Sequence, residues 1–117
     1  MGFAIQTQAV GPVLVLEAVG RFTAVDGHTK LRDLIHVLTN SGTKKFVLNM
    51  ERVEFIDSSG IGELLRSHFV VRQAAGELKL ASVNAKVMEV LRISHMHTVF
   101  EIHPVAAEAL GAFERKL

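Results

Sequence analysis

The chain has 117 residues, of which 49% are hydrophobic and 21% are charged, and its 13 Lys and Arg against 12 Asp and Glu give a formal net charge of +1. This length and composition predict one folded domain and exclude a disordered chain, while a net charge so near zero disfavours direct binding of nucleic acid. The absence of Cys excludes disulfides, thiolate metal ligands and cysteine nucleophiles.

The first twenty residues predict a β-hairpin. Hydrophobic and polar residues alternate approximately over Phe3–Val10, Gly11 and Pro12 provide a turn, and Val13–Val19 is rich in β-branched and aliphatic residues. The two strands are therefore expected to pair antiparallel, with Gly20 ending the second one.

A helix is expected after the hairpin. Thr23 stands three residues before Asp26, which is the spacing of a capping box, and Ser41 with Gly42 follows the last turn. The predicted helix therefore runs from about Thr23 to Asn40. Its apolar stripe consists of Val25, Leu31, Leu34, Ile35 and Leu38.

The middle of the chain predicts an inner strand and a second helix. Lys45–Asn49 is a short, almost continuous apolar run, and the helix extends from about Ser59 to Ala75, where Gly76 stops it. The predicted apolar face of this helix comprises Ile61, Leu64, Leu65, His68, Val71 and Ala75. The charged residues Glu63, Arg66 and Arg72 are expected largely on the opposite side.

The C-terminal part predicts two more strands and two more helices. They are a strand at Glu77–Ala81, a helix capped by Asn84 and extending to Ile93, a strand at Val99–Ile102, and a helix from Pro104 to about Lys116. The resulting order, β-β-α-β-α-β-α-β-α, implies right-handed crossovers and mostly parallel pairing. We therefore predict a single α/β domain over residues 1–117, with helices packed on a mixed, mostly parallel sheet.

The segment 57–62 is the most informative part of the sequence. It contains Asp57, Ser58, Ser59, Gly60, Ile61 and Gly62, and it lies where a strand region leads into a helix. Asp57, Ser58 or Ser59 can cap that helix, and the two glycines allow a tight turn and the close approach of another surface. A serine before a helix is usually only a cap. Two serines, an acid and two glycines within six residues exceed what a cap needs, and the helix N-terminus provides a field that tolerates a phosphate.

This segment, together with the preceding strand residues Phe46-Val47-Leu48-Asn49, resembles the STAS domain family, and within it the free-standing bacterial anti-sigma-factor antagonists. The length, the element order and Gly20 fit that family over nearly the whole chain. The resemblance implies that Ser58 is a phosphoacceptor and that segment 57–62 is a partner-binding loop. It further implies that the unphosphorylated protein binds an anti-sigma factor that is itself a serine kinase and so frees a sigma factor. Phosphorylation would end this binding, and a serine phosphatase would restore it.

Two positions depart from the family pattern. An acidic pair often follows the glycine of the second strand, whereas here Gly20 is followed by Arg21, Phe22 and Thr23, so the partner or its docking face can differ. The family's third helix commonly ends on Gly, but Ser94-His95-Met96 stands here, and His adopts a left-handed backbone less readily than Gly. An alternative function is that of an unphosphorylated STAS interaction subunit of a transporter or a larger signalling assembly.

Other classes of function are not expected. His95, His97 and nearby His103 lack the further ligands that a zinc site needs, so neither a metal nor a cofactor is predicted. Ile56 stands where a nucleophile elbow has Gly, and Glu63 follows Gly62 where a P-loop has Lys, so no enzyme activity is predicted. Because no secretory signal or membrane-length apolar run is visible, we expect a cytoplasmic protein without membrane insertion.

Overall fold

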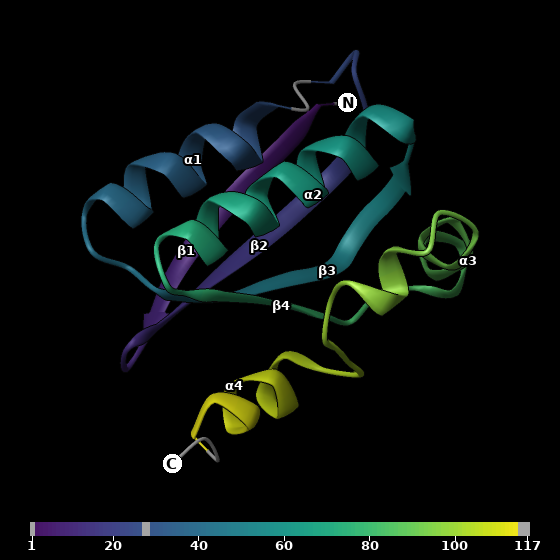
Figure 1. Ribbon diagram of the computed structural model, residues 1–117. Helices are drawn as coiled ribbons and strands as arrows, with labels where there is room; N and C mark the ends of the chain where they lie inside the picture. The colour runs from purple at the N-terminus through teal and green to yellow at the C-terminus, as the bar shows by residue number, and fades with distance from the viewer. Residues whose placement is uncertain (1, 27–28, 115–117) are drawn as a thin grey trace.

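The structure is a computed structural model that describes residues 2–26 and 29–114. Within these residues the strands are β1 (Phe3–Val10), β2 (Val13–Phe22), β3 (Lys45–Ile56), β4 (Glu77–Ala81) and β5 (Ile102–His103). The helices are α1 (Thr29–Asn40), α2 (Ser58–Gln73), α3 (Ala85–Ile93) and α4 (Ala106–Glu114), with a 3-10 turn at Met96–Thr98 (Figure 1). The predicted α/β class and element order are confirmed.

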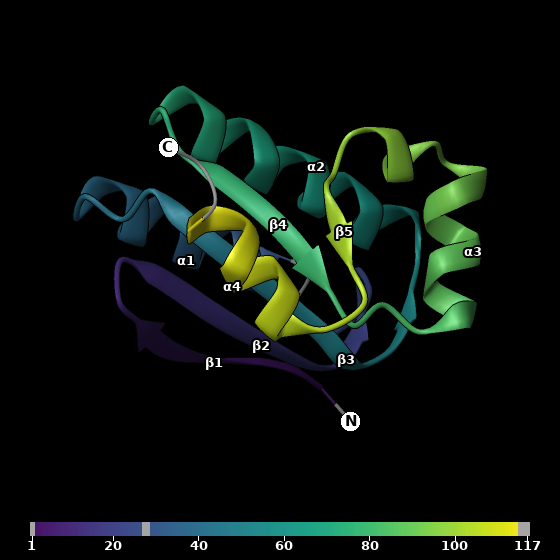
Figure 2. The ribbon, with the colours of Figure 1, turned by 90° about the horizontal axis from the view of Figure 1, so that it is seen from below.

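The described strands form one mixed sheet in the order β1-β2-β3-β4-β5. β1 and β2 pair antiparallel as the predicted hairpin, and every other neighbouring pair is parallel. Helices α1 and α2 cover one face, α4 lies on the other, and α3 lies beside the sheet beyond β5 (Figures 1 and 2). The larger core lies under α1 and α2, and a smaller one under α4 joins Val13, Val47, Ala81, Ala109 and Phe113.

Two strands are longer than the sequence predicts. β2 continues to Phe22 instead of ending at Val19, and β3 continues to Ile56 instead of ending at Asn49. The extensions pair with each other, with register shifts opposite Glu17/Val19 and Gly20/Arg21 of β2, and at each shift β3 contains one additional residue. These irregularities disturb the alternation of buried and exposed side chains along the strands. Phe22, Val53 and Ile56 are thereby buried in the core. The strand therefore continues past the polar residues near Asn49.

Helix α1 begins later than the sequence predicts. The Thr23 hydroxyl donates to Asp26 Oδ2 at 2.8 Å, and the Asp26 N–H donates to Thr23 Oγ1 at 3.3 Å. The two side chains therefore close a local turn that resembles a cap, while the helix itself starts at Thr29. Leu31 and Ile35 form the buried face as expected, but Val25 lies in the turn with 92% of its surface exposed.

The end of α3 adopts the conformation that a glycine would favour. Asn84 caps this helix as predicted, accepting a hydrogen bond from the Val87 N–H at 2.8 Å. After the helix, His95 has φ 63° and ψ 16°, the left-handed conformation. The backbone geometry that the family pattern assigns to a glycine is therefore kept here with a histidine.

The C-terminal boundaries differ from the prediction by a few residues. Residues 96–98 form a 3-10 turn, so the last strand is the short Ile102–His103 and not Val99–Ile102. Helix α4 begins at Ala106, two residues after Pro104, and is described as far as Glu114. The predicted end near Lys116 lies outside the described residues.

Glu63 lies on the buried side of α2, contrary to the sequence prediction. Only 2% of its surface is exposed. Its carboxylate contacts Arg32 Nε of α1 at 3.2 Å and Arg66 Nη1 at 2.9 Å. A carboxylate can be buried here because guanidinium groups accompany it, and the pair links α1 to α2.

Candidate functional site

Asp57 joins the end of β3 to the start of α2. Its backbone is extended, with φ −110° and ψ −174°, and its Oδ1 accepts a hydrogen bond from the Gly60 N–H at 2.9 Å. Its Oδ2 also accepts one from the Ala24 N–H at 3.4 Å, which ties the site to the turn after β2. Of the three residues that the sequence offers as caps, Asp57 is therefore the one that caps α2.

Ser58 is the first residue of α2, and its side chain is exposed. In the part of the chain that the structure describes, no hydrogen bond engages its hydroxyl, since the capping bond comes from Asp57. Ser59, the next residue, is partly buried. Neither serine side chain is therefore needed to cap α2, and Ser58 is the more accessible of the two.

Gly60 and Gly62 have different roles in the structure. A Cβ on Gly60 would stand 2.2 Å from the carbonyl oxygen of Phe22 and 2.8 Å from Ile56 Cγ1, so only glycine lets α2 start so close to β2. A Cβ on Gly62 would meet only the flexible Arg66 side chain, with Nη1 at 3.0 Å. Both glycines lie inside α2 and neither has a positive φ, so the predicted tight turn is wrong. Gly60 permits the close approach of β2 within the chain, whereas the approach of another surface stays a prediction. Ile61 is partly buried and packs against the main core.

A pocket adjoins this site between β2, β3 and the turn at residues 23–26. It has a volume of about 390 Å³ and is lined by Arg21, Thr23, Val25, Asp26, Phe55 and Asp57. Arg21 Nε lies 3.6 Å from Asp26 Oδ2, and its guanidinium carbon is 5.7 Å from the centre of the Phe55 ring. Lys86 Nζ of α3 lies 5.5 Å from the same ring centre. Phe55 is therefore accompanied by two cations beside the predicted partner-binding loop.

Phe55, Lys86 and the exposure of Val25 were not predicted from the sequence as parts of the site. Lys86 follows Phe55 by 31 residues, and only the fold brings them together. The exposure of Val25 depends on the late start of α1, whereas the capping-box spacing of Thr23 and Asp26 predicted an earlier start. A signal was nevertheless present at Arg21, because a basic residue there departs from the family pattern.

The site does not resemble a hydrolytic active site. His68, on the same helix, is ten residues beyond Ser58, which corresponds to about 15 Å along the helix axis. Its ring packs against Phe69 and Phe100, with ring centres 5.7 Å and 5.1 Å apart. Burial lowers the pKa of His68 below its usual value of 6.5, the nearby Arg72 lowers it further, and Glu77 partly opposes both. His68 therefore belongs to the packing of the helix rather than to the Ser58 site.

The described part of the chain contains no group of three or more His, Asp or Glu residues arranged to hold a metal ion. His103 contacts Glu101 at 2.5 Å, and the His95 and His97 rings lie 6.3 Å apart. Across residues 2–26 and 29–114, no helix combines the length and apolarity that crossing a membrane requires.

Comparison with known proteins identifies the family. The STAS domain family matches residues 4–109, and the chain belongs to this family. It is 25% identical over 119 residues to the anti-sigma F factor antagonist of Paenibacillus polymyxa, covering 97% of each chain.

Solved structures share the fold. The crystal structure of TM1081 from Thermotoga maritima aligns with this chain with a TM-score of 0.87 at 23% identity, and the alignment covers 95% of each chain. The anti-sigma factor antagonist SpoIIAA in its unphosphorylated form has a TM-score of 0.72 at 21% identity and covers 97% of this chain and 100% of its own. The phosphorylated form of SpoIIAA, from Bacillus, also has a TM-score of 0.72, at 22% identity over 94% of this chain and 99% of its own.

Proposed function

We propose that this protein is an anti-sigma-factor antagonist controlled by phosphorylation of Ser58. The unphosphorylated form binds an anti-sigma factor with serine kinase activity and thereby frees a sigma factor. Phosphate transfer to the Ser58 hydroxyl ends this binding, and a serine phosphatase restores it. The protein has no enzyme activity of its own in this proposal, and it acts in the cytoplasm, where sigma factors work.

The observation that carries the proposal is the exposed hydroxyl of Ser58, which has no hydrogen bond among residues 2–26 and 29–114 and stands beside a cap made by Asp57. A kinase can reach this hydroxyl without unfolding the helix, because the capping bond does not depend on it. The names of the antagonists to which the chain is similar support the same function. The existence of SpoIIAA in an unphosphorylated and a phosphorylated form supports the proposed kind of control.

A phosphate on Ser58 adds about 1.5–2 negative charges at neutral pH at one point of the surface. Helix α2 tolerates this charge, since Ser58 lies in its first turn, where the helix dipole favours an anion. A packed partner without a matching cation does not tolerate it. A loss of about 4 kcal/mol corresponds to roughly a thousandfold weaker binding, so no large change of shape is needed.

The pocket next to the loop indicates the character of the partner surface. Arg21 and Lys86 flank the Phe55 ring, and Val25 projects beside them with 92% of its surface exposed. We expect the anti-sigma factor to place an apolar side chain against Val25 and a carboxylate near the two cations. Replacement of the family's acidic pair by Arg21 and Thr23 thus changes which anti-sigma factor is bound.

The test is the affinity for the cognate anti-sigma factor, measured by isothermal titration calorimetry. Ser58→Asp should weaken binding at least tenfold, and Ser58→Ala should bind as the wild type does. Gln73→Glu is the control for added negative charge: this residue is exposed at the opposite end of α2, and the variant should bind as the wild type does. Wild-type affinity in Ser58→Asp would contradict the switch. Full cellular function in Ser58→Ala, with no phosphoprotein detected, would instead favour an unphosphorylated interaction subunit.

A further inference from the structure

Strand β1 is an exposed sheet edge without the features that usually prevent strand pairing. It spans eight residues, Phe3–Val10, and contains no charged residue and no proline. Its pairing with β2 is regular, without a bulge, from Phe3 to Val10. Natural edge strands are usually interrupted by charges, prolines or bulges, because an open edge is a template for another strand.

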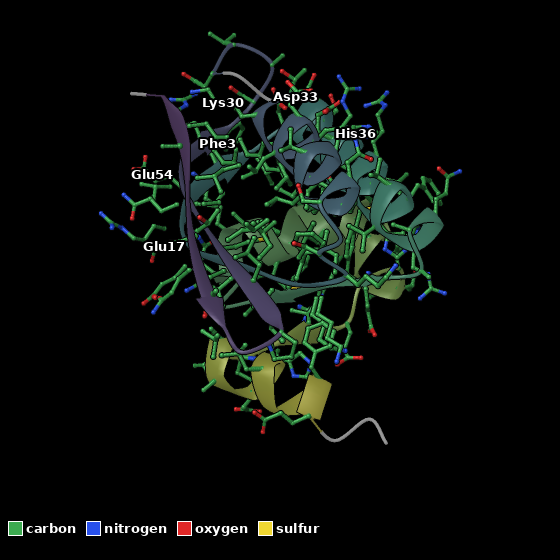
Figure 3. All side chains as sticks on the ribbon, turned by 90° about the vertical axis from the view of Figure 1, so that its left-hand side faces the viewer. Phe3, Glu17, Lys30, Asp33, His36 and Glu54 are labelled. Atoms are coloured by element: carbon green, nitrogen blue, oxygen red, sulfur yellow. The ribbon has the colours of Figure 1, made fainter. Side chains whose placement is uncertain are left out.

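The helices on the two faces of the sheet leave the β1 edge open. Among the described elements, none lies beyond β1, which forms one margin of the sheet (Figure 2). In the view towards this margin, the labelled polar side chains come from other elements (Figure 3): Lys30, Asp33 and His36 from α1, Glu17 from β2, and Glu54 from β3.

The hydrogen-bond pattern identifies which backbone groups face outward. The Arg21 N–H donates to the Gly2 carbonyl at 3.3 Å, so Gly2 and Arg21 form a hydrogen-bonded pair of the antiparallel ladder. Such pairs alternate along the ladder, and the even-numbered residues of β1 therefore bond to β2. The N–H and C=O groups of Ile5, Thr7 and Ala9 point away from the sheet. At the start of the strand, Lys30 Nζ donates to the Phe3 carbonyl at 2.8 Å and covers that group.

We infer that β1 pairs with β1 of a second copy of this chain, antiparallel about a twofold axis at Thr7. This register places Thr7 opposite Thr7 of the second copy and Ile5 opposite Ala9. The outward N–H and C=O groups of these three residues then satisfy one another, and the two sheets join into one. In this register the Phe3 carbonyl keeps its hydrogen bond from Lys30 Nζ.

The side chains of the strand are compatible with their own copy. Directly opposed residues share one face, so Gln6 meets Gln8 of the second copy, and Ala4 meets Val10. Each glutamine amide both donates and accepts, so the Gln6–Gln8 pairs can bond to each other. No like charges are opposed, because the strand has none. This self-complementarity favours a second copy over a partner of different sequence.

Dimerisation leaves the proposed switch accessible. Ser58 lies at the end of the sheet where β3 finishes and β1 starts, because β3 runs parallel to β2 and antiparallel to β1. The twofold axis sends the two Ser58 loops to opposite ends of the joined sheet. Each copy thus presents its own loop, and dimerisation does not depend on phosphorylation.

Sedimentation velocity over a wide range of protein concentrations tests this inference. The wild type should pass from monomer to dimer as its concentration rises. Thr7→Lys and Thr7→Glu should each dimerise at least about tenfold more weakly, since like charges then face each other across the axis. An equimolar mixture of the two variants should recover the dimer, because Lys then faces Glu. Ile93→Lys, at another exposed site on α3 away from β1, is the control and should dimerise as the wild type does.

Thr7→Pro provides a second test. It removes only an outward-facing N–H, so the β1–β2 ladder is kept and circular dichroism should show a folded protein. This variant should remain monomeric. A wild type that stays monomeric at every concentration would overturn the inference, as would a Thr7→Pro or Thr7→Lys variant that dimerises like the wild type.

Discussion

The Asp57 carboxylate accepts the Gly60 N–H at 2.9 Å, so the cap of α2 does not use the neighbouring Ser58 hydroxyl. Asp57→Ala should lower the free energy of unfolding by about 1 kcal/mol, because the first turn of α2 loses its cap. Asp57→Asn keeps an acceptor oxygen and should stay close to the wild type. Urea unfolding followed by circular dichroism measures both, and equal losses in the two variants would show that the carboxylate acts through its charge instead.

Gly60 and Gly62 form a matched pair for testing the contact between α2 and β2. Gly60→Ala should destabilise the protein by about 3 kcal/mol, since its Cβ would stand 2.2 Å from the Phe22 carbonyl oxygen. Gly62→Ala should be neutral or stabilising by up to about 1 kcal/mol, because alanine favours a helix and the Arg66 side chain can move. Chemical denaturation of both variants should give this order, and the reverse order would refute the packing described at Gly60.

The left-handed conformation of His95 predicts a stabilising substitution. His95→Gly should raise the free energy of unfolding by about 1 kcal/mol, because glycine adopts φ 63° without steric cost. His95→Ala is the control, since it removes the ring but keeps the Cβ, and it should give no such gain. Thermal unfolding compares the two, and a gain shared by both variants would assign the effect to the ring.

Burial of His68 predicts a pH dependence of stability. The pKa of His68 is lowered in the folded protein, first by burial and then by Arg72, so the unfolded chain binds the proton more tightly. Stability from this residue is therefore present above pH 6.5 and is lost as the pH falls below that value towards the folded pKa. His68→Leu should remove this part of the acid sensitivity. Urea unfolding of the wild type and of His68→Leu, at neutral and at mildly acidic pH, measures this difference. Equal losses of stability in the two proteins would contradict the prediction.

The sequence was sufficient to predict the elements whose patterns are local. The hairpin, the cap at Asn84 and the strand Glu77–Ala81 all appear where turn residues, capping residues and apolar runs place them. The position of Ser58 at the start of α2 follows from the same kind of signal. These features depend on residues that are close together in the sequence, so they can be predicted from the sequence alone.

What the sequence did not predict depends on contacts between distant segments. Lys79 lies in a strand, yet it is fully buried because Glu77 and Glu101 each hold its Nζ at 2.8 Å and Phe113 of α4 covers it. Glu63 is buried because Arg32 reaches it from α1. The placement of Phe55 between Arg21 and Lys86 likewise requires three separate elements, and no local pattern encodes it.

The phosphorylation site tests the central claim most directly. Trypsin releases residues 53–66 as one peptide, whose only hydroxyl side chains are Ser58 and Ser59. The wild-type protein should be incubated with its cognate anti-sigma factor and ATP, and this peptide should then be sequenced by tandem mass spectrometry. The proposed switch predicts a single phosphate on Ser58. A phosphate on Ser59 alone, or an unmodified peptide after complete reaction with an active kinase, would contradict it.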